Sequence, residues 1–378
     1  MSHNGKDVTA LVLTGGGARG AYQVGALRAI ADLVGERSPF DLVAGVSAGA
    51  LNGAAVATSV DDFAAGVARL EATWRALTPE QVYRTDLASL GEIAVGWLRR
   101  LGGGGFLGAD HVNALLDTSP LRALLRRTLA MAHVRDHVAS GRLRGLAVTA
   151  TSYQSGQAIS FFDGHPAIEP WTRAGRVGQR ARLSVEHVLA SAAIPVLFPP
   201  VTVGGAALGD GCIRLTAPLS PAIHLGAERI VAIGIQAAGE PPAHDRAARP
   251  TPAEIGGVLL NAVFLDSLEA DAERHLRINS TLAAMAPAQR AAQALREIPL
   301  LVLRPSVDLG QLAVEQYREL PVALRYLLRG IGADGQRGWD LVSYLAFEPV
   351  YVQRLVELGY RDTCARRDEL MAFLAPPR

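Results

Sequence analysis

Two glycine-rich turns, each lying between an apolar run and a helical pattern, constrain the fold of this chain more than any other feature. The first follows Thr9–Thr14 and reads Gly15-Gly-Gly-Ala-Arg-Gly20. The second ends the run Leu42–Val46 and reads Gly45-Val-Ser47-Ala-Gly49. An apolar run that passes through a tight glycine turn into a helix is typical of a strand–turn–helix unit. Because the two units repeat in the same sense, we expect both turns to open at one edge of one sheet.

The second turn predicts a nucleophilic serine. Ser47 stands on a strand-to-helix elbow, where its oxygen would project from the sheet above the N-terminus of the next helix. A serine that only caps the helix is the alternative, but glycine on both sides favours the strained elbow of a nucleophile. The neighbouring loop of Gly15, Gly16 and Gly17 could aim backbone N–H groups at a developing oxyanion. Together the two turns predict an acyl-transfer site.

The glycine loop also fits a second class of protein. Its spacing, Gly15-x-Gly17-x-x-Gly20, satisfies the dinucleotide fingerprint of a nucleotide-binding oxidoreductase of the Rossmann type. That site needs an acidic residue at the end of the second strand, whereas Asp41 lies at the start of this strand. Arg19 at the helix start opposes the macrodipole and is easier to explain if it meets a carboxylate or a phosphate. The second strand therefore disfavours the nucleotide interpretation.

A nucleophilic serine needs a base. The order Ser, acid, His of an α/β-hydrolase requires several strands before the nucleophile, and only one clear strand precedes Ser47. None of the histidines that follow plausible acids stands on a glycine-flanked turn at a strand end. Asp210, in Leu208-Gly-Asp-Gly211, lies just after a predicted hairpin and is the better candidate, with an ordinary Asp-Gly turn as the alternative.

Alternating apolar runs and helical patterns fill the first two-thirds of the chain. This alternation predicts an α/β fold with a mainly parallel sheet covered on both faces. Further strands are expected at 144–151, 158–162 and 229–235, with a hairpin at 201–208 that turns at Gly204-Gly205.

The remaining sequence predicts the domain organisation. We expect a catalytic core over residues 7–235, a proline-rich surface loop at 236–252, and a helical C-terminal region over 253–378. Thr251-Pro-Ala-Glu254 is a good helix start, and this helix is expected to run towards Ile278. One strand at about 299–303 should return to the core sheet.

Composition excludes several classes. Lys plus Arg number 37 against 36 for Asp plus Glu, so no global field favours nucleic acid. Cys212 and Cys364 cannot make a disulfide framework, which fits a reducing compartment. The start has no apolar signal segment and no apolar stretch reaches membrane-spanning length. We therefore expect a cytoplasmic protein with no nucleic-acid partner, and, because no Cys/His cluster or calcium loop is present, with no metal and no cofactor.

The segment 87–101 carries an amphipathic helical pattern. Its apolar side chains, Trp97 among them, fall on one face, and Gly102–Gly105 follow as a hinge. Packing of this stripe on the core is the first interpretation. A lid over an acyl chain, or a peripheral contact with a membrane surface, is the alternative.

Four motifs in this order resemble the patatin-like phospholipase family. They are the loop Gly15–Gly20, the elbow Gly45–Gly49, the run Ala190-Ser-Ala-Ala-Ile-Pro-Val-Leu-Phe-Pro-Pro200, and Asp210-Gly211. The third of them is similar to the family's bacterial members. The motifs spread over about residues 7–235, and the resemblance implies a three-layer α/β sandwich with added C-terminal helices.

What the resemblance implies about chemistry is a Ser–Asp dyad without histidine. Ser47 would attack an ester carbonyl and Asp210 would act as its base. The N–H groups of Gly15–Gly17, joined by that of Ala48, would hold the oxyanion, and Arg19 would support the loop. The expected activity is hydrolysis of carboxylic esters in phospholipids, lysophospholipids or related lipids.

One position departs from the family pattern. The family commonly has Asp-Gly-Gly or Asp-Gly-Ala, whereas Cys212 follows Asp210-Gly211 here. A cysteine is small enough to fit, and a carboxylate base works best when burial raises its pKa. Transfer of the acyl group to another acceptor, and a catalytically silent lipid-binding or regulatory protein, stay open as alternatives.

Overall fold

The structure is a computed structural model that describes residues 7–84, 114–237, 251–314, 317–320, 322–330, 332–333 and 338–375. The amphipathic segment predicted at 87–101, and most of the loop expected at 236–252, lie outside the described residues. The division of the chain into core, loop and C-terminal region therefore stays a proposal.

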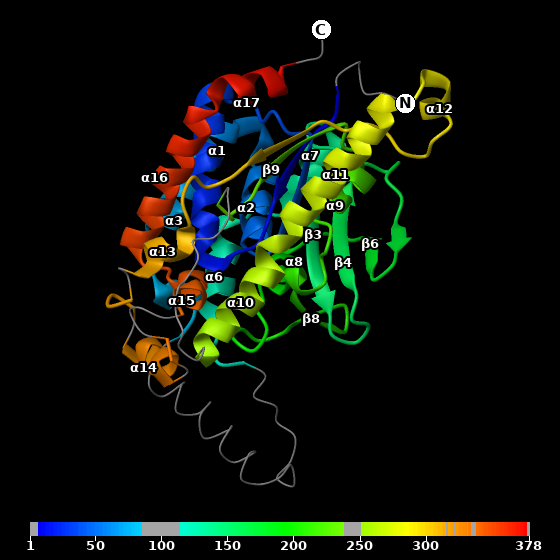
Figure 1. Cartoon of the computed structure of the whole chain (residues 1–378). Coiled ribbons are helices and arrows are strands. Elements are labelled where there is room, and N and C mark those ends of the chain that lie inside the picture. The colour runs from blue at the N-terminus through cyan, green and yellow to red at the C-terminus, as the bar shows by residue number, and fades with distance from the viewer. Residues whose placement is uncertain are drawn as a thin grey trace.

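A mostly parallel sheet forms the centre of the molecule (Figure 1). Five neighbouring parallel strands come in the order β10 (Leu300–Leu303), β9 (Arg229–Ile233), β1 (Thr9–Leu13), β2 (Leu42–Val46) and β3 (Gly145–Ser152). Beyond β3 the sheet continues through β4 (Ala158–Gly164), β6 (Arg176–Arg180) and β5 (Trp171–Arg173). The hairpin of β7 (Val201–Val203) and β8 (Ala206–Asp210) joins this sheet by antiparallel pairing of β8 with β3.

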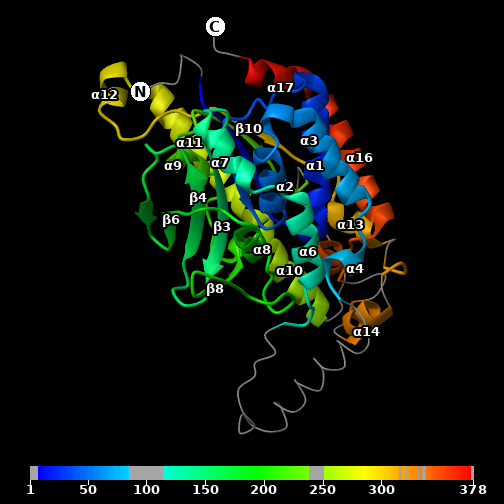
Figure 2. The same cartoon turned by 180° about the vertical axis from the view of Figure 1, so that it is seen from behind.

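Helices cover both faces of the sheet because its strands are apolar on both sides. In β1, Leu11 and Leu13 belong to one buried cluster, and Ala10 and Val12 belong to another on the opposite face. The first face carries α1 (Ala21–Val34), α2 (Ala48–Ala57), α3 (Phe63–Arg75), α6 (Ser119–Thr128), α8 (Val185–Ser191) and α16 (Pro349–Ala365). The second carries α9 (Ser220–Leu225) and α11 (Asp266–Ala284). Accordingly α11 lies in front of the sheet in Figure 1 and α6 lies in front of it in Figure 2.

The other helices complete the outer layers. They are α4 (Pro79–Val82), α7 (Ala132–Ala139), α10 (Pro252–Phe264), α12 (Pro287–Ala291), α13 (Leu309–Ala313), α14 (Val322–Gly330), α15 (Trp339–Leu345) and α17 (Arg367–Leu374). The predicted three-layer α/β fold with C-terminal helices is confirmed.

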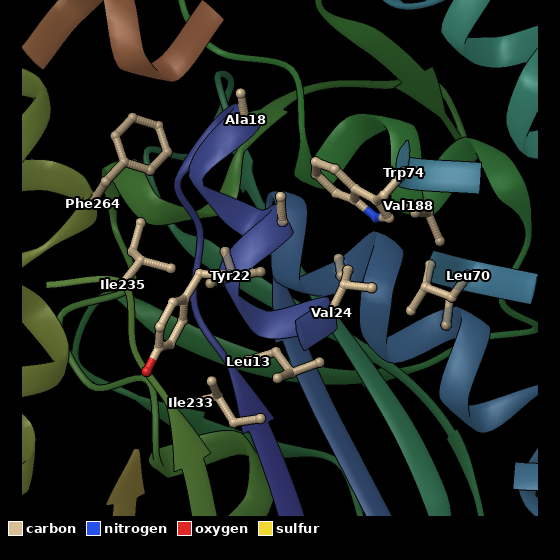
Figure 3. Packing of buried hydrophobic residues seen from close by; sticks show 14 of the residues in the cluster. Leu13, Ala18, Tyr22, Val24, Leu70, Trp74, Val188, Ile233, Ile235 and Phe264 are labelled. Carbon is tan, nitrogen blue, oxygen red and sulfur yellow. The ribbon is translucent and has the colours of Figure 1, made fainter. Parts of the chain in front are cut away.

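The C-terminal helix α16 packs against α1 over most of its length, and the two lie side by side in Figure 1. Glycine allows this close approach: a Cβ at Gly25 would overlap the carbonyl oxygen of Val356, and one at Gly359 would overlap that of Tyr22. In Figure 3, Leu13 and Ile233 of adjoining strands lie next to Tyr22 of α1. The N-terminal unit and the C-terminal helices therefore share one core.

Two details of the prediction are wrong. The helix that starts at the capping box of Thr251 and Glu254 ends at Phe264, and a second helix, α11, then runs to Ala284. The break has a packing reason, because Phe264 enters the first core cluster and Leu268 enters the second on the other face of the sheet. Strands β5 and β6 were not predicted, since both are short and contain arginine at exposed positions, and β5 is the edge strand of the sheet.

Candidate active site

Ser47 lies at the end of β2, on the elbow that leads into α2. Strands β1 and β2 are adjacent and parallel, so the glycine loop and the elbow open at the same edge of the sheet, as predicted. The backbone of Ser47 has φ 55° and ψ −128°, a left-handed conformation that costs free energy and is typical of functional turns. Its side chain makes no hydrogen bond that caps α2, which argues against a capping role.

The elbow is possible only because its flanking residues are glycines. A Cβ at Gly45 would overlap the carbonyl oxygen of Gly49, and one at Gly49 would overlap the carbonyl oxygen of Leu13. Both positions therefore let α2 start directly against strands β1 and β2, which keeps Ser47 close to the glycine loop.

Ser191 of α8 fixes the backbone of the elbow by hydrogen bonding. The N–H of Ser47 donates to Ser191 Oγ at 2.9 Å, and Ser191 Oγ donates to the carbonyl oxygen of Thr149 at 2.6 Å. Ser191 is fully buried. Sequence reasoning did not assign it a role, although it lies in the Ala190–Pro200 run that resembles the family. The bond also means that the Ser47 N–H is not available to a substrate.

Asp210 ends β8 and is brought to the site by the pairing of β8 with β3. The side chain has no solvent exposure. Its Oδ1 accepts a hydrogen bond of 2.9 Å from the N–H of Cys212, whereas its buried Oδ2 has no hydrogen bond of normal geometry. The Ser47 hydroxyl is nevertheless near enough to the carboxyl to lower its pKa. Burial is the larger effect and raises the pKa of Asp210 from 3.8 to about 7.

The glycine loop packs against Ser47 on one side and against Cys212, next to Asp210, on the other. A Cβ built at Gly15 would come within 2.7 Å of Ser47 Cβ and would overlap Cys212 Sγ. The thiol of Cys212 lies near the Gly15 N–H and the Asp210 carboxyl, and burial raises the pKa of this thiol. Cys212 thus fills the space between loop and carboxylate. Among the described atoms, the N–H groups of Gly16, Gly17 and Ala48 have no acceptor.

Arg19 connects the glycine loop to the C-terminal region. It is 1% exposed, and its guanidinium donates to Ser343 Oγ at 2.7 Å and to Asp340 Oδ1 at 2.9 Å. It also lies 4.4 Å from the centre of the Tyr344 ring. Arg19 therefore pairs with a carboxylate, which is one of the two kinds of partner that its place in the sequence suggested. Gly17, with φ 56°, packs so closely on α15 that a Cβ would overlap the carbonyl oxygen of Tyr344.

An apolar cavity of about 410 Å³ begins at the candidate nucleophile. Gly17, Ser47 and Ala48 line one end of the cavity, and its walls come mainly from α2, α3 and α6. Figure 2 views the molecule from the side on which these helices lie. The volume is in the range of cavities that bind small ligands. The sequence did not predict this cavity, because its walls come from separate helices.

No helix within the described ranges is long and apolar enough to cross a bilayer. The same residues include no group of three or more His, Cys, Asp or Glu side chains arranged to hold a metal ion.

The protein therefore belongs to the class of α/β proteins that carry a serine on a strand-to-helix elbow at one edge of the sheet. The sequence model of the patatin-like phospholipase family matches residues 11–223, which is more than half of the chain. The chain therefore belongs to the patatin-like phospholipase family, and the resemblance found in its motifs is confirmed. A search of curated proteins gave no match.

Solved structures of similar fold include three proteins of low sequence identity. VipD from Legionella pneumophila is 13% identical with a TM-score of 0.37, over 96% of this chain and 67% of that one. Human GIVD cytosolic phospholipase A2 is 12% identical with a TM-score of 0.45, over 99% of this chain and 60% of that one. ExoU from Pseudomonas aeruginosa, in its complex with SpcU, is 16% identical with a TM-score of 0.30, over 97% of this chain and 77% of that one. The chain thus spans about two-thirds or less of the length of the first two.

Proposed function

We propose that this protein is a serine lipid acyl hydrolase in which Ser47 is the nucleophile and Asp210 is the base. The observation that carries the proposal is the pairing of a strained, glycine-flanked serine with a fully buried carboxyl whose pKa is about 7. A carboxyl with this pKa is ionised in half of the molecules near neutral pH and still binds a proton well, which is what a general base needs.

The reaction follows from these positions. Asp210 takes the proton of the Ser47 hydroxyl as its oxygen bonds to the ester carbonyl carbon. The alcohol of the lipid leaves with a proton from Asp210, and the acyl group stays on Ser47 as an ester. Water then gives a proton to Asp210 as it attacks this acyl-enzyme. Asp210 returns that proton to the Ser47 oxygen as the bond to the acyl group breaks, which releases the fatty acid and restores both residues.

The negative charge on the carbonyl oxygen needs donors close to Ser47. We assign this role to the N–H groups of Gly17 and Ala48, which lack acceptors and line the same cavity as Ser47, with Gly16 beside them. The N–H of Gly15, expected as a further donor, lies beside the Cys212 thiol and stays part of the proposal. Arg19 acts indirectly, since its contacts with Asp340 and Ser343 fix the turn that follows the loop.

Labelling with a fluorophosphonate probe tests the nucleophile and the base together. Wild type should label, Ser47→Ala should not, and Asp210→Asn should label at least about 1,000-fold more slowly. Thermal unfolding of each variant serves as the control for folding. Unlabelled but folded wild type, or unchanged labelling in Ser47→Ala, would contradict the proposal and favour a silent lipid-binding protein.

Product analysis separates hydrolysis from transfer. With a phospholipid substrate in water, the proposal predicts free fatty acid as the product. A protein that consumes phospholipid only when another alcohol is present, and yields its ester, would be an acyltransferase on the same dyad.

A further inference from the structure

Two amide side chains are buried beneath the site, and the proposed reaction uses neither of them. They belong to Gln23 of α1 and Asn52 of α2, and neither residue has any solvent exposure. Burial of an amide costs free energy unless its N–H and C=O groups find hydrogen-bond partners. An apolar side chain of similar size would fill the same space without that requirement. The two amides therefore require an explanation beyond packing.

Gln23 holds the start of the glycine loop. Its Nε2 donates to the carbonyl oxygen of Thr14, the residue before Gly15, at 2.8 Å. The same nitrogen donates to the carbonyl oxygen of Ile233, at the end of β9, at 3.3 Å. Because a carbonyl oxygen can only accept, the amide must point its nitrogen at both. The Gln23 side chain therefore ties the end of β1 to the end of the adjacent strand β9, at the point where the loop begins.

Asn52 holds the other end of the loop. Its Nδ2 donates to the carbonyl oxygen of Gly20 and to Gln23 Oε1, both at 3.0 Å. Its Oδ1 accepts the indole N–H of Trp74, which is labelled in Figure 3, at 2.9 Å. An indole N–H can only donate and a carbonyl oxygen can only accept, so the Asn52 amide has one allowed orientation. The two amides thus form one connected network in which every N–H and C=O is used.

The network joins the glycine loop to the helix that begins at the nucleophile. Within the described ranges, no backbone hydrogen bond links residues 15–20 to α2, and the bond from Asn52 to Gly20 provides this link. Asn52 follows Ser47 by five residues, in the second turn of α2. The loop and α2 also touch here, since a Cβ at Gly20 would come within 2.7 Å of Ala48 Cβ. The distance between the loop and Ser47 therefore depends on this network.

We propose that Gln23 and Asn52 are positioning residues of the hydrolase, whose amides hold the N–H groups of the glycine loop at the distance from Ser47 that the oxyanion needs. This inference rests on the proposed function and adds two residues on which its geometry depends. Neither side chain lines the cavity, so both act through Thr14 and Gly20 at the two ends of the loop. Oxyanion donors are effective because they need no rearrangement during the reaction, and a misplacement of about 1 Å can cost on the order of 100-fold in rate.

Variants that preserve the shape of each side chain test the network. Gln23→Met and Asn52→Leu remove its amide hydrogen bonds, whereas Asn52→Asp keeps the acceptor for Trp74 and has at most one hydrogen to donate in place of two. Rates are measured on one chromogenic ester, at a temperature where thermal unfolding shows each protein to be folded. We expect kcat to fall about 100-fold in the first two variants and at least about tenfold in Asn52→Asp. Because acylation and deacylation both pass through an oxyanion, KM should change by less than about threefold.

Asn279 supplies the matched control. Its amide bonds the carbonyl oxygen and the N–H of Ile298, at 2.7 and 3.2 Å, but it lies on α11 at the opposite face of the sheet. Asn279→Leu and Asn279→Asp should lower the melting temperature and keep the wild-type kcat. Asn52→Asp has the shape of the native side chain, so it keeps the test decisive where Asn52→Leu does not fold.

A pair of inhibitors separates positioning from loss of stability. A trifluoromethyl ketone bonds through its carbonyl carbon to the Ser47 oxygen, the serine proton passes to Asp210, and the ketone oxygen becomes an oxyanion. An ether analogue of the substrate has no carbonyl and binds without forming this charge. In folded Asn52→Asp, the inhibition constant of the ketone should rise by the same factor as kcat/KM falls, and that of the ether should stay within about twofold. A purely structural role would change neither constant in folded protein.

The outcomes distinguish this proposal from the one on which it rests. Wild-type values of kcat and of ketone inhibition in folded Gln23→Met and Asn52→Asp would overturn the positioning role, while the dyad would stand. An equal loss of kcat in the Asn279 variants would also overturn it, since the effect would follow stability alone. Absence of ester hydrolysis by folded wild type would overturn the proposed function and the positioning role with it.

Discussion

Ser47 and Asp210 come to the same place by different structural means. Ser47 sits on a parallel-strand elbow with φ 55°, and its position depends on glycines that let backbone pack on backbone. Asp210 ends an antiparallel hairpin with φ −54° and ψ 131°, an ordinary conformation that any residue can adopt. Its special property is complete burial, which raises its pKa.

This difference teaches which changes each half should tolerate. The backbone around Ser47 is tightly packed, so a methyl group added at a flanking glycine should distort the elbow. The aspartate side is limited by solvation, so a change in charge or hydrogen bonding should alter it without distorting the backbone. The predictions below separate the two, from the largest expected effect to the smallest.

The largest effect is expected from the titration of Asp210. Because its pKa is raised from 3.8 to about 7, the folded protein binds this proton more tightly than the unfolded chain does. The resulting stability is present in full below pH 3.8 and is lost as the pH rises to about 7. The loss amounts to about 4 kcal/mol. Asp210→Asn cannot ionise, so chemical denaturation from pH 4 to 8 should show it gaining stability relative to wild type by that order.

The same titration sets the activity. Since the base must be ionised, kcat/KM of wild type should rise about tenfold per pH unit below a midpoint near pH 7 and level off above it. A flat profile from pH 5 to 8, or a midpoint near 4, would show that Asp210 is either not the base or not buried in solution.

Gly49→Ala tests the serine side. The new Cβ would overlap the carbonyl oxygen of Leu13, so we expect a loss of about 3 kcal/mol in the free energy of unfolding and a collapse of fluorophosphonate labelling. Gly256→Ala is the matched control, because no atom lies within 4 Å of its added Cβ in α10. It should stabilise the protein by up to about 1 kcal/mol and leave labelling unchanged. Equal effects in both variants would contradict the close packing of the elbow.

Ser191→Ala removes a hydrogen-bond bridge without adding volume. The Ser47 N–H and the Thr149 carbonyl would both lose their buried partner, at a cost of about 2 kcal/mol in unfolding free energy. Labelling should slow, because the elbow loses its fixed position. Ser306→Ala, which removes an exposed hydroxyl bonded to Asp362, should cost less than about 1 kcal/mol. Stability equal to wild type in Ser191→Ala would show that the bridge is not formed.

The smallest effect is expected at Cys212. Its thiol lowers the pKa of Asp210 by hydrogen bonding, so Cys212→Ala should move the midpoint of the pH–activity profile upward. Cys364→Ala, at the exposed cysteine, should leave the midpoint in place. A downward shift in Cys212→Ala would mean that the thiol disfavours the ionised base.

Local sequence patterns predicted much of this arrangement. Strand β2 was placed at its observed ends, the two glycine turns were placed at one sheet edge, and the hairpin before Asp210 was recognised from its Gly204-Gly205 turn. These features are readable because strands, glycine turns and hairpins are each specified within a few residues. The roles of Ser47 and Asp210 stay predictions until they are tested.

What the sequence did not predict depends on contacts between distant segments. The bridge through Ser191 spans 144 positions, and the contact of Arg19 with Ser343 spans 324. The burial of Asp210 is likewise a property of everything packed around it. No local periodicity encodes such contacts, so neither the bridge nor the apolar cavity could be found before the fold was known.

The contact of the glycine loop with α15 limits which gene segments could be exchanged between proteins of this kind. The match to the family model ends at residue 223, yet Arg19 contacts Asp340 and Ser343, and Gly17 packs on the backbone of Tyr344. A gene segment that covered only this match would encode Ser47 and Asp210 and leave the Arg19 guanidinium without its carboxylate partner. The portion that matches the family model is thus smaller than the portion that must fold together. Recombination that exchanged the last helices would change the packing around the glycine loop without altering any motif residue.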